Sequence, residues 1–340
     1  MGWVCSYTPL ELIYAAKFLP YRIVGHSNPV KNAHSYIHPN YCQFVKSSID
    51  VAIDGGYNFL EGVVFINSCD AMRRLYDVWK RFVPSKFVYL LDLPMGDSSL
   101  GYKYLRDEFY KLKIALETHT GRIIQEEALE RAIMLFTKSR SLYWKLNSLR
   151  LENPPLISGK EMMDHTNEFF KSDPKMWNDN KKDLIEEKRE KDLENHKPRI
   201  LLSGSPIHNV EFIDFIENCG LNVIYEDLCT GSKFFDLNVP KSKDPLMSLS
   251  KAYINRPPCA RMMKIEERAA YISKISQKFE IDGIIHHSLK FCDTYLYDVP
   301  HLRDLLNEEG LKVLFIESDG LESMNQLKTR IEAFTEMIKN

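Results

Sequence analysis

The sequence predicts an α/β fold made of two Rossmann-like parallel-sheet halves with an inserted helical segment. Short apolar runs of strand length alternate with helical patterns on both sides of a long helical stretch, which is typical of parallel sheets. In that stretch, from residue 99 to about 151, apolar residues recur at three- and four-residue spacing throughout. With 340 residues, the chain is long enough for two domains. We expect an N-terminal α/β domain with a helical extension, a charged helix or linker, and a C-terminal α/β domain, at residues 1–178 (extension about 99–178), 179–198 and 199–340.

The N-terminal half begins with a well-marked helix. Thr8 is the expected N-cap, Pro9 suits the first turn and Glu11 completes a capping box, so we predict a helix over residues 9–18. Further along, the apolar runs predict strands at 21–25, 62–66 and 86–91, with a helix at 71–82.

The C-terminal half follows a run of mixed-sign charge. Residues 180–196 are almost continuously charged, which indicates a solvated helix or linker. After it, the pattern predicts strands at 199–203, 221–225, 283–287 and 311–316, and helices at 210–219, between the last two strands and up to Lys339.

Composition excludes several classes of protein. The net charge of −2 gives no electrostatic reason to expect nucleic acid or an anionic membrane as a partner. No apolar run reaches the roughly 18 residues needed to cross a bilayer, and the first residues do not resemble a signal peptide. Seven cysteines are an odd number and not an enriched one, which favours reduced thiols over a disulfide framework. We therefore expect a cytoplasmic protein.

The two halves resemble each other around their cysteines. In each half a strand is followed by a Cys-Asp pair, a helix and another strand, and these pairs begin at Cys69 and Cys292. Upstream of each pair, a cysteine close to a proline precedes a helix, at Cys42 and Cys259. A repeat of this kind places equivalent residues at equivalent sheet edges.

Several cysteines lie where metal ligands or reactive thiols are expected. Cys69 and Cys292 come just after a strand and just before a helix, at the edge where parallel sheets form their sites. The helix dipole and free backbone N–H groups lower the pKa of a thiol there. Cys42, Cys229 and Cys259 are expected in loops beside strands or helices.

We expect the thiols to hold an iron–sulfur cluster between the two halves, although their spacing alone does not identify it. Thiolates gathered from distant loops are compatible with such a cluster, whereas zinc would favour a Cys-x-x-Cys pair, which the sequence lacks. Cys219, on a predicted helix, is expected to be a small buried hydrophobe. The segments 203–208 and 230–233 do not complete a dinucleotide or phosphate-binding motif, and there is no Gly-x-Ser-x-Gly elbow.

Four ordered motifs resemble those of the 2-hydroxyacyl-CoA dehydratase subunits. That family also includes benzoyl-CoA reductase subunits and the double-cubane cluster proteins. The motifs cover nearly the whole chain and begin Cys5-Ser-Tyr-Thr-Pro, Asn67-Ser-Cys-Asp, Glu226-Asp-Leu-Cys-Thr-Gly and Lys290-Phe-Cys-Asp. One departure is Lys17, where the family usually has a glycine that closes the helix, and the sequence suggests no chemical consequence of it.

The resemblance implies a 4Fe-4S cluster held by Cys42, Cys69 and Cys292, with the fourth iron site open or bridged. It also implies a separate ATP-dependent iron–sulfur activator protein that supplies one low-potential electron. In the dehydratases this electron reduces a thioester carbonyl to a ketyl radical anion, which expels the hydroxyl group. The chain itself lacks an ATP motif, which fits this division of labour.

Three hypotheses about function stay open at this point. The first is a dehydratase-like lyase with one cluster and an acyl-CoA substrate. In the second, Cys5, Cys229 and Cys259 join the other three ligands to hold an 8Fe-9S double cubane, as in the related proteins thought to reduce small molecules. The third is an electron-transfer or cluster-assembly component without a substrate. The sequence does not distinguish a homodimer from a heterodimer with a related subunit. It leaves acid–base groups unassigned, although four candidates lie near the motifs: Ser6, Tyr7, His26 and His287.

Overall fold

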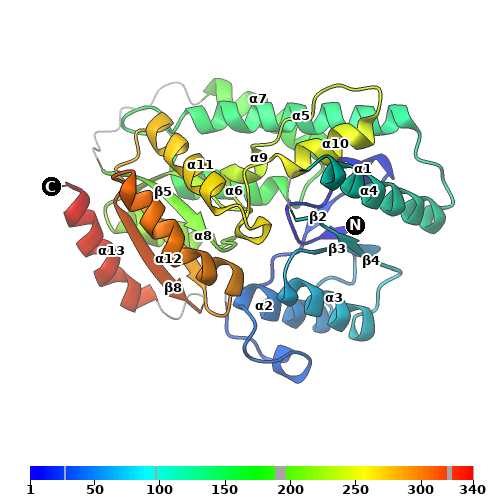
Figure 1. The fold of residues 1–340 in the computed structure, drawn as a ribbon, viewed down its shortest axis with the longest axis horizontal. Helices are drawn as coiled ribbons and strands as arrows, with labels where there is room; N and C mark the ends of the chain where they lie inside the picture. The colour runs from blue at the N-terminus through cyan, green and yellow to red at the C-terminus, as the bar shows by residue number, and fades with distance from the viewer. Residues whose placement is uncertain (27, 96–97, 188–196, 320–323, 340) are drawn as a thin grey trace.

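The computed structural model describes residues 1–26, 28–95, 98–187, 197–319 and 324–339 and confirms the α/β fold (Figure 1). Its strands form two four-stranded sheets in which all pairs are parallel. The first sheet has the order β2-β1-β3-β4 and the second has the order β6-β5-β7-β8. The strands are β1 (Gly2–Trp3), β2 (Tyr21–Arg22), β3 (Gly62–Asn67), β4 (Phe87–Asp92), β5 (Arg199–Gly204), β6 (Asn222–Asp227), β7 (Gly283–Leu289) and β8 (Val313–Ser318).

The two sheets share one topology, because the third strand of each half lies between the first and the fourth. The repeat seen in the sequence therefore corresponds to equivalent places in the fold. The helices are α1 (Leu10–Ala15), α2 (Gln43–Ile53), α3 (Asp70–Phe82), α4 (Ser99–Thr120), α5 (Glu126–Ser148), α6 (Gly159–Phe169), α7 (Pro174–Glu187), α8 (Val210–Asn218), α9 (Ser232–Phe235), α10 (Pro245–Ile254), α11 (Ile265–Lys278), α12 (Asp293–Glu308) and α13 (Met324–Lys339), with 3-10 turns η1 (Ala33–Ser35) and η2 (Ala260–Met262).

The helical extension consists of several helices. The expectation of continuous helix over residues 99–151 is wrong, because Gly121 adopts a left-handed φ of 67° and ends α4 before α5 begins. Helices α5 and α7 then lie side by side along one edge of the molecule (Figure 1). Residues 188–196 of the predicted charged segment lie outside the described residues, so the boundaries of the predicted domains stay a prediction.

Part of the C-terminal half packs into the core of the N-terminal half. Helix α10 lies against α4 (Figure 1). The indole of Trp3 on β1 stacks on Phe234 of α9, with ring centroids 5.6 Å apart. Because aromatic rings bury large apolar areas, this packing ties the segment after β6 to the first sheet.

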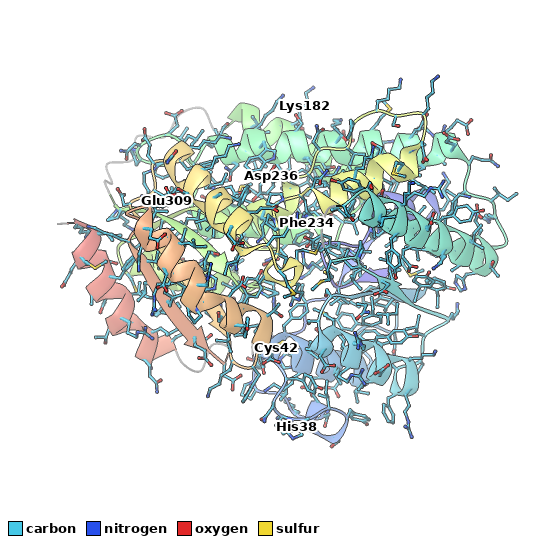
Figure 2. The ribbon with its side chains drawn as sticks, viewed as in Figure 1. His38, Cys42, Lys182, Phe234, Asp236 and Glu309 are labelled. Atoms are coloured by element: carbon cyan, nitrogen blue, oxygen red, sulfur yellow. The ribbon has the colours of Figure 1, made fainter. Side chains whose placement is uncertain are left out.

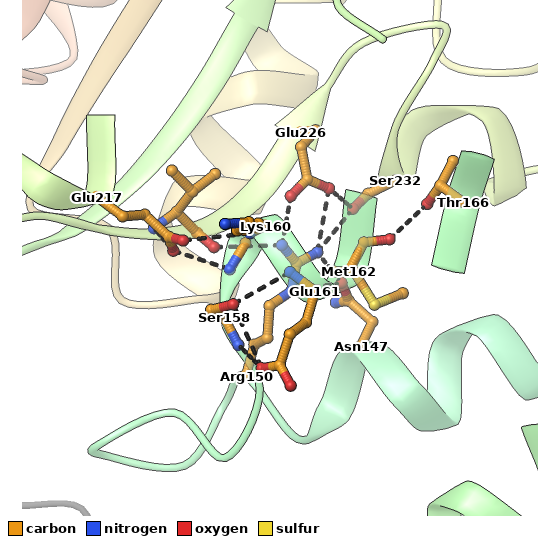
Figure 3. Close-up of polar contacts among 12 residues, drawn as sticks. Asn147, Arg150, Ser158, Lys160, Glu161, Met162, Thr166, Glu217, Glu226 and Ser232 are labelled. Atoms are coloured by element: carbon orange, nitrogen blue, oxygen red, sulfur yellow. Dashed lines mark hydrogen bonds and ion pairs between the residues drawn. The ribbon is translucent and has the colours of Figure 1, made fainter. Parts of the chain in front are cut away.

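A buried ion pair fixes the same segment to the helical extension (Figure 3). Arg150 lies just after the end of α5. Its guanidinium donates to both carboxylate oxygens of Glu226 on β6, and it also donates to Ser232 Oγ at 3.0 Å. The Ser232 hydroxyl donates in turn to Glu226 at 2.6 Å. Glu226 begins one of the four motifs, so that motif residue has a structural role, because it positions the loop that carries Cys229.

The capping box predicted for the first helix is wrong. Helix α1 begins at Leu10 after Pro9, and no side chain caps it. The Glu11 carboxylate is fully buried and accepts hydrogen bonds from the Arg140 guanidinium and, at 2.8 Å, from the Tyr253 hydroxyl. A charge-assisted tertiary contact has thus taken the place of the local cap. The next strand, β2, is also shorter than predicted, because its partner β1 pairs with it over only two residues.

Lys17 closes α1 in a conformation that favours glycine. Its φ is 67°, and its N–H donates to Tyr14 O at 2.9 Å while the N–H of Phe18 donates to Ile13 O at 3.2 Å. This pair of bonds is a Schellman motif, whose left-handed residue is usually glycine. The departure noted in the sequence therefore has a consequence for the backbone.

Replacing Lys17 by glycine is expected to stabilise the protein. Relief of the left-handed strain outweighs the greater freedom of glycine in the unfolded chain, so the free energy of unfolding should rise by about 0.5–1 kcal/mol. Urea unfolding followed by circular dichroism measures it. The control is Lys17→Ala, which keeps a Cβ at the same φ and should give no gain. Equal stability of all three proteins would contradict the prediction.

Candidate cysteine site between the two halves

Three cysteines begin helices at the seam between the halves. Cys42, Cys69 and Cys292, here called the first triad, are the N-cap residues of α2, α3 and α12. Cys69 follows β3 and Cys292 follows the equivalent strand β7, as the sequence pattern predicted. Just before Cys292, Phe291 has a left-handed φ of 60°, which turns the chain from β7 into α12.

The first triad lines one cavity of about 590 Å³. Figure 2 shows Cys42 where the N-terminal half meets the C-terminal half. Other walls of the cavity come from Arg261 and from side chains around its mouth, among them Tyr297, which is 88% exposed. Thiols from loops far apart in the sequence therefore face a common space that is large enough for a cofactor.

Burial and helix dipoles act on these thiols in opposite directions. Burial, together with the nearby Cys292 and Cys69 thiols, raises the pKa of Cys42 to about 12. Burial also raises the pKa of Cys292. Three helix N-termini converge here, and their partial positive charge favours anions. Without a cation Cys42 holds its proton, whereas coordination to iron would remove it.

The other three candidate cysteines gather in a second group. Cys5, Cys229 and Cys259, here called the second triad, lie close enough for the Cys259 and Cys229 thiols to raise the pKa of Cys5, although burial contributes most of that shift. All three side chains are buried.

Protein groups already contact two sulfurs of the second triad. The Arg22 guanidinium lies 3.3 Å from Cys229 Sγ, and the Arg261 guanidinium lies 3.3 Å from Cys259 Sγ. Burial alone would raise the pKa of Cys259, but Arg261 and Lys233 outweigh it and lower that pKa to about 7. This triad is thus surrounded by cations, whereas the first triad faces a cavity.

Each triad mixes the two halves of the chain. The first takes two cysteines from the N-terminal half and one from the other, and the second does the reverse. Each half of the sequence contains three of the six candidate cysteines, but the two triads in the structure do not follow that division. Cys219 lies apart, at the end of α8, where its carbonyl accepts a hydrogen bond from Thr335 at 3.2 Å. Whether the six cysteines are ligands stays a prediction.

The three thiols of the first triad are donors of the kind that iron–sulfur clusters use. Within the described ranges, no three His, Cys, Asp or Glu side chains lie close enough to hold one metal ion. A cluster of several irons spreads its ligands more widely than one ion does, and thiolates are its usual ligands. Three thiols around an open space therefore suit an iron–sulfur cluster.

The chain matches one family of known proteins over almost its whole length. The model of the 2-hydroxyglutaryl-CoA dehydratase D-component family covers residues 5–338. The chain belongs to this family. The match confirms the resemblance drawn from the four motifs, and with it the expectation of an enzyme component of the dehydratase type.

Relatives of this D-component family member are subunits of dehydratases and of a reductase. The (R)-phenyllactyl-CoA dehydratase beta subunit of Clostridium sporogenes is 24% identical over 99% of this chain and 91% of that protein. A benzoyl-CoA reductase subunit of Thauera aromatica is 24% identical over 100% of this chain and 90% of that protein. The (R)-2-hydroxyglutaryl-CoA dehydratase subunit beta of Acidaminococcus fermentans is 22% identical over 99% and 92%. All three names describe one chain of a larger enzyme. In the described part of this chain, no helix has the length and apolar character needed to cross a membrane.

A smaller cavity of about 50 Å³ brings three histidines together beside the first triad. It is lined by His26, His208 and His287, together with Phe44, which lies two residues after Cys42. The sequence had singled out two of these histidines, but not His208. His208 ends the segment that follows β5. Its position after a strand, where parallel sheets form their sites, is the sequence signal that could have identified it. Both ring nitrogens of His208 are buried and have no hydrogen-bond partner among the described residues.

The remaining two acid–base candidates lie elsewhere. The carbonyl of Ser6 accepts a hydrogen bond from the Arg256 guanidinium. Tyr7 is buried, and burial raises the pKa of its hydroxyl, with the Cys259 thiol adding to that shift. Both residues therefore belong to the surroundings of the second triad. Of the four acid–base candidates, His26 and His287 are the two that line the cavity of about 50 Å³.

His208 and His287 make stability depend on pH. Burial lowers the pKa of His208 and of His287 to about 4, below the ordinary value of about 6.5 in an unfolded chain. The unfolded chain therefore binds more protons as the pH falls below 6.5. Stability present above that pH is lost towards pH 4, by about 2 kcal/mol per histidine at pH 5.

Urea unfolding at several values between pH 8 and pH 5 measures this loss. The variant His208→Leu should lose less stability over that range than the unchanged protein, by about 2 kcal/mol. His38→Asn, on an exposed loop, is the control and should behave like the unchanged protein. The same pH dependence in His208→Leu would contradict the prediction.

Proposed function

We propose that this chain is the iron–sulfur component of a 2-hydroxyacyl-CoA dehydratase-like enzyme, with Cys42, Cys69 and Cys292 holding a 4Fe-4S cluster. The observation that carries the proposal is the cavity of about 590 Å³ into which these three thiols are gathered from both halves. Membership of the D-component family supports the same conclusion.

The chain's own residues would hold and shield the cofactor. The three N-cap positions present the sulfurs, and the helix dipoles stabilise the thiolates once iron has displaced their protons. Arg261 and Phe291 would form part of the wall around the cofactor, because both side chains line the cavity. When bound, a cluster of this type supplies electrons one at a time at low potential.

The proposed partners follow from what the chain contains and what its relatives are called. The sequence has no ATP motif, so the low-potential electron would come from a separate ATP-dependent iron–sulfur activator. The relatives are named as subunits, which supports pairing with a related subunit or a second copy of this chain. These contacts would form in the cytoplasm, without nucleic acid.

A double-cubane reductase of small molecules is the second candidate, and the second triad favours it. Cys5, Cys229 and Cys259 lie together, and Arg261 contacts Cys259 while lining the cavity of the first triad. Six thiols in two adjacent groups would suit an 8Fe-9S double cubane. A cluster-bearing electron carrier without its own substrate is the third.

Oxygen-free purification and iron analysis test the ligand assignment. We expect about four iron atoms per chain, and Cys69→Ser should retain less than about half of that iron, because an alcohol is a poor substitute for a thiolate. The matched control is Cys219→Ser, since Cys219 lies apart from both triads, and it should keep all its iron. A colourless, iron-free wild-type protein would refute the proposal.

The same measurement separates one cluster from two. With a single cluster, Cys259→Ser keeps the iron content of the unchanged protein. With a double cubane, the unchanged protein holds about eight irons, and Cys259→Ser loses a large part of them. An iron content of about eight would therefore replace the first candidate by the second.

Binding of an acyl-CoA distinguishes the dehydratase from the other two candidates. We expect a 2-hydroxyacyl-CoA to bind the oxygen-free protein, as measured by isothermal titration calorimetry, because the cavity opens beside exposed polar and aromatic side chains such as Tyr297 and His301. The free 2-hydroxy acid is the control and should bind more weakly. Iron-loaded protein that ignores the acyl-CoA would favour the reductase or the carrier.

A further inference from the structure

The Arg261 side chain connects the two cysteine triads. It belongs to η2, directly after Cys259, and its guanidinium nitrogen Nη1 lies 3.3 Å from Cys259 Sγ. The same side chain lines the cavity of about 590 Å³ together with Cys42, Cys69 and Cys292. It is 7% exposed and also lies over the ring of Tyr295, 5.9 Å from its centroid.

The charge of Arg261 has no carboxylate to balance it in the described part of the chain. Two other buried cations nearby, Lys233 and Arg268, do have such partners. Lys233 Nζ lies 2.7 Å from Asp227 Oδ1, and the Arg268 guanidinium donates to Asp298 at 2.6 Å. The Nε of Arg261 has no hydrogen-bond partner among the described residues. An unpaired charge is costly to bury, so the site must supply negative charge in another form.

Thiolates and the cofactor they hold are the available source of that charge. The atom that Arg261 contacts is the sulfur of Cys259, and the sulfurs of the first triad face the same cavity. Hydrogen bonds to the sulfurs and the local net charge set the reduction potential of iron–sulfur centres. A buried cation at this place therefore acts on the electron that the cofactor accepts.

We propose that Arg261 is a positioning residue that raises the reduction potential of the iron–sulfur centre at the first triad through its guanidinium charge, which no carboxylate among the described residues balances. The inference rests on the proposed function, since it requires that the three thiols hold a cluster. Adding one electron to the bound centre makes its charge more negative by one, and no bond forms or breaks. Arg261 attracts that added charge, whereas Lys233 and Arg268 are neutralised by Asp227 and Asp298.

The test is a redox titration of oxygen-free, iron-loaded full chain followed by electron paramagnetic resonance. Arg261→Gln removes the charge and should shift the midpoint potential to a more negative value. Arg261→Lys keeps the charge without the planar fork of donors, so its potential should lie between those of the Gln variant and the unchanged protein. The control is Arg303→Gln, an exposed residue beside Asp304, which should leave the potential unchanged.

Three outcomes would overturn the inference. One is an iron-replete Arg261→Gln protein with the potential of the unchanged chain. Another is an equal shift in the Gln and Lys variants, which would show that geometry and not charge matters. If Arg261→Gln loses its iron, Arg261→Met carries the comparison, since its aliphatic stem can pack over Tyr295. Loss of iron from both, with an unchanged thermal unfolding temperature, would show that the guanidinium retains the cluster and does not tune it.

The failure of the proposed function has a different signature. In that case the unchanged protein itself holds no iron, and no potential is measured for any variant. An iron-loaded unchanged protein with an unshifted Arg261→Gln variant contradicts the role of Arg261 alone.

Discussion

Parallel pairing in both sheets is the constraint on which the site depends. All strands of a parallel sheet point the same way, so the loops that follow them emerge at one edge. The loop after β3 carries Cys69, the loop after β7 carries Cys292, and the loop after β6 carries Cys229. Because the halves meet along these edges, thiols far apart in the chain come together without any local Cys-x-x-Cys motif.

The position of these loops is maintained by buried charge pairs of a common design. Arg150 is bound by Glu226, and Arg268 is bound by Asp298. The Ser203 hydroxyl at the end of β5 donates to Asp227 at 2.7 Å, which links the loop ends of β5 and β6. Removing one partner of such a pair leaves an uncompensated buried charge at a cost of about 3–5 kcal/mol, so these contacts hold the cysteine-bearing loops firmly. Glu226 and Asp227 follow each other in one motif, so that motif is as much structural as chemical.

The sequence predicted the fold class and the places of the cysteines because both follow from local patterns. Apolar runs mark β3 and β7, and a cysteine directly after such a strand lies at the start of a helix, as Cys69 and Cys292 do. Local patterns do not reveal contacts between residues that lie far apart in the chain. The Glu11 carboxylate pairs with Arg140, which lies far along the chain, so the predicted capping box did not form. Periodicity alone also could not show where Gly121 breaks the helical stretch.

The grouping of the thiols escaped prediction for the same reason. Equivalent positions in the two halves, such as Cys42 and Cys259, end in different triads, and no spacing along the chain reveals that exchange. The sequence did not identify His208 as a candidate either. The fold does, because it brings His208 into a cavity with His26 and His287.

The two triads differ in what surrounds them, although the halves share one topology. The first triad opens onto a cavity, and burial keeps the pKa of Cys42 and Cys292 high until a cation arrives. The sulfurs of the second are held by Arg22 and Arg261, and Arg22 is itself clasped between the rings of Trp3 and Phe170, each 4.7 Å from its guanidinium carbon. A guanidinium fixed in this way is costly to move. Insertion of iron at the second triad would therefore require rearrangement of packed cations, whereas at the first triad the space and the exposed approach are already present. This difference in surroundings, and not the number of cysteines, distinguishes the two triads.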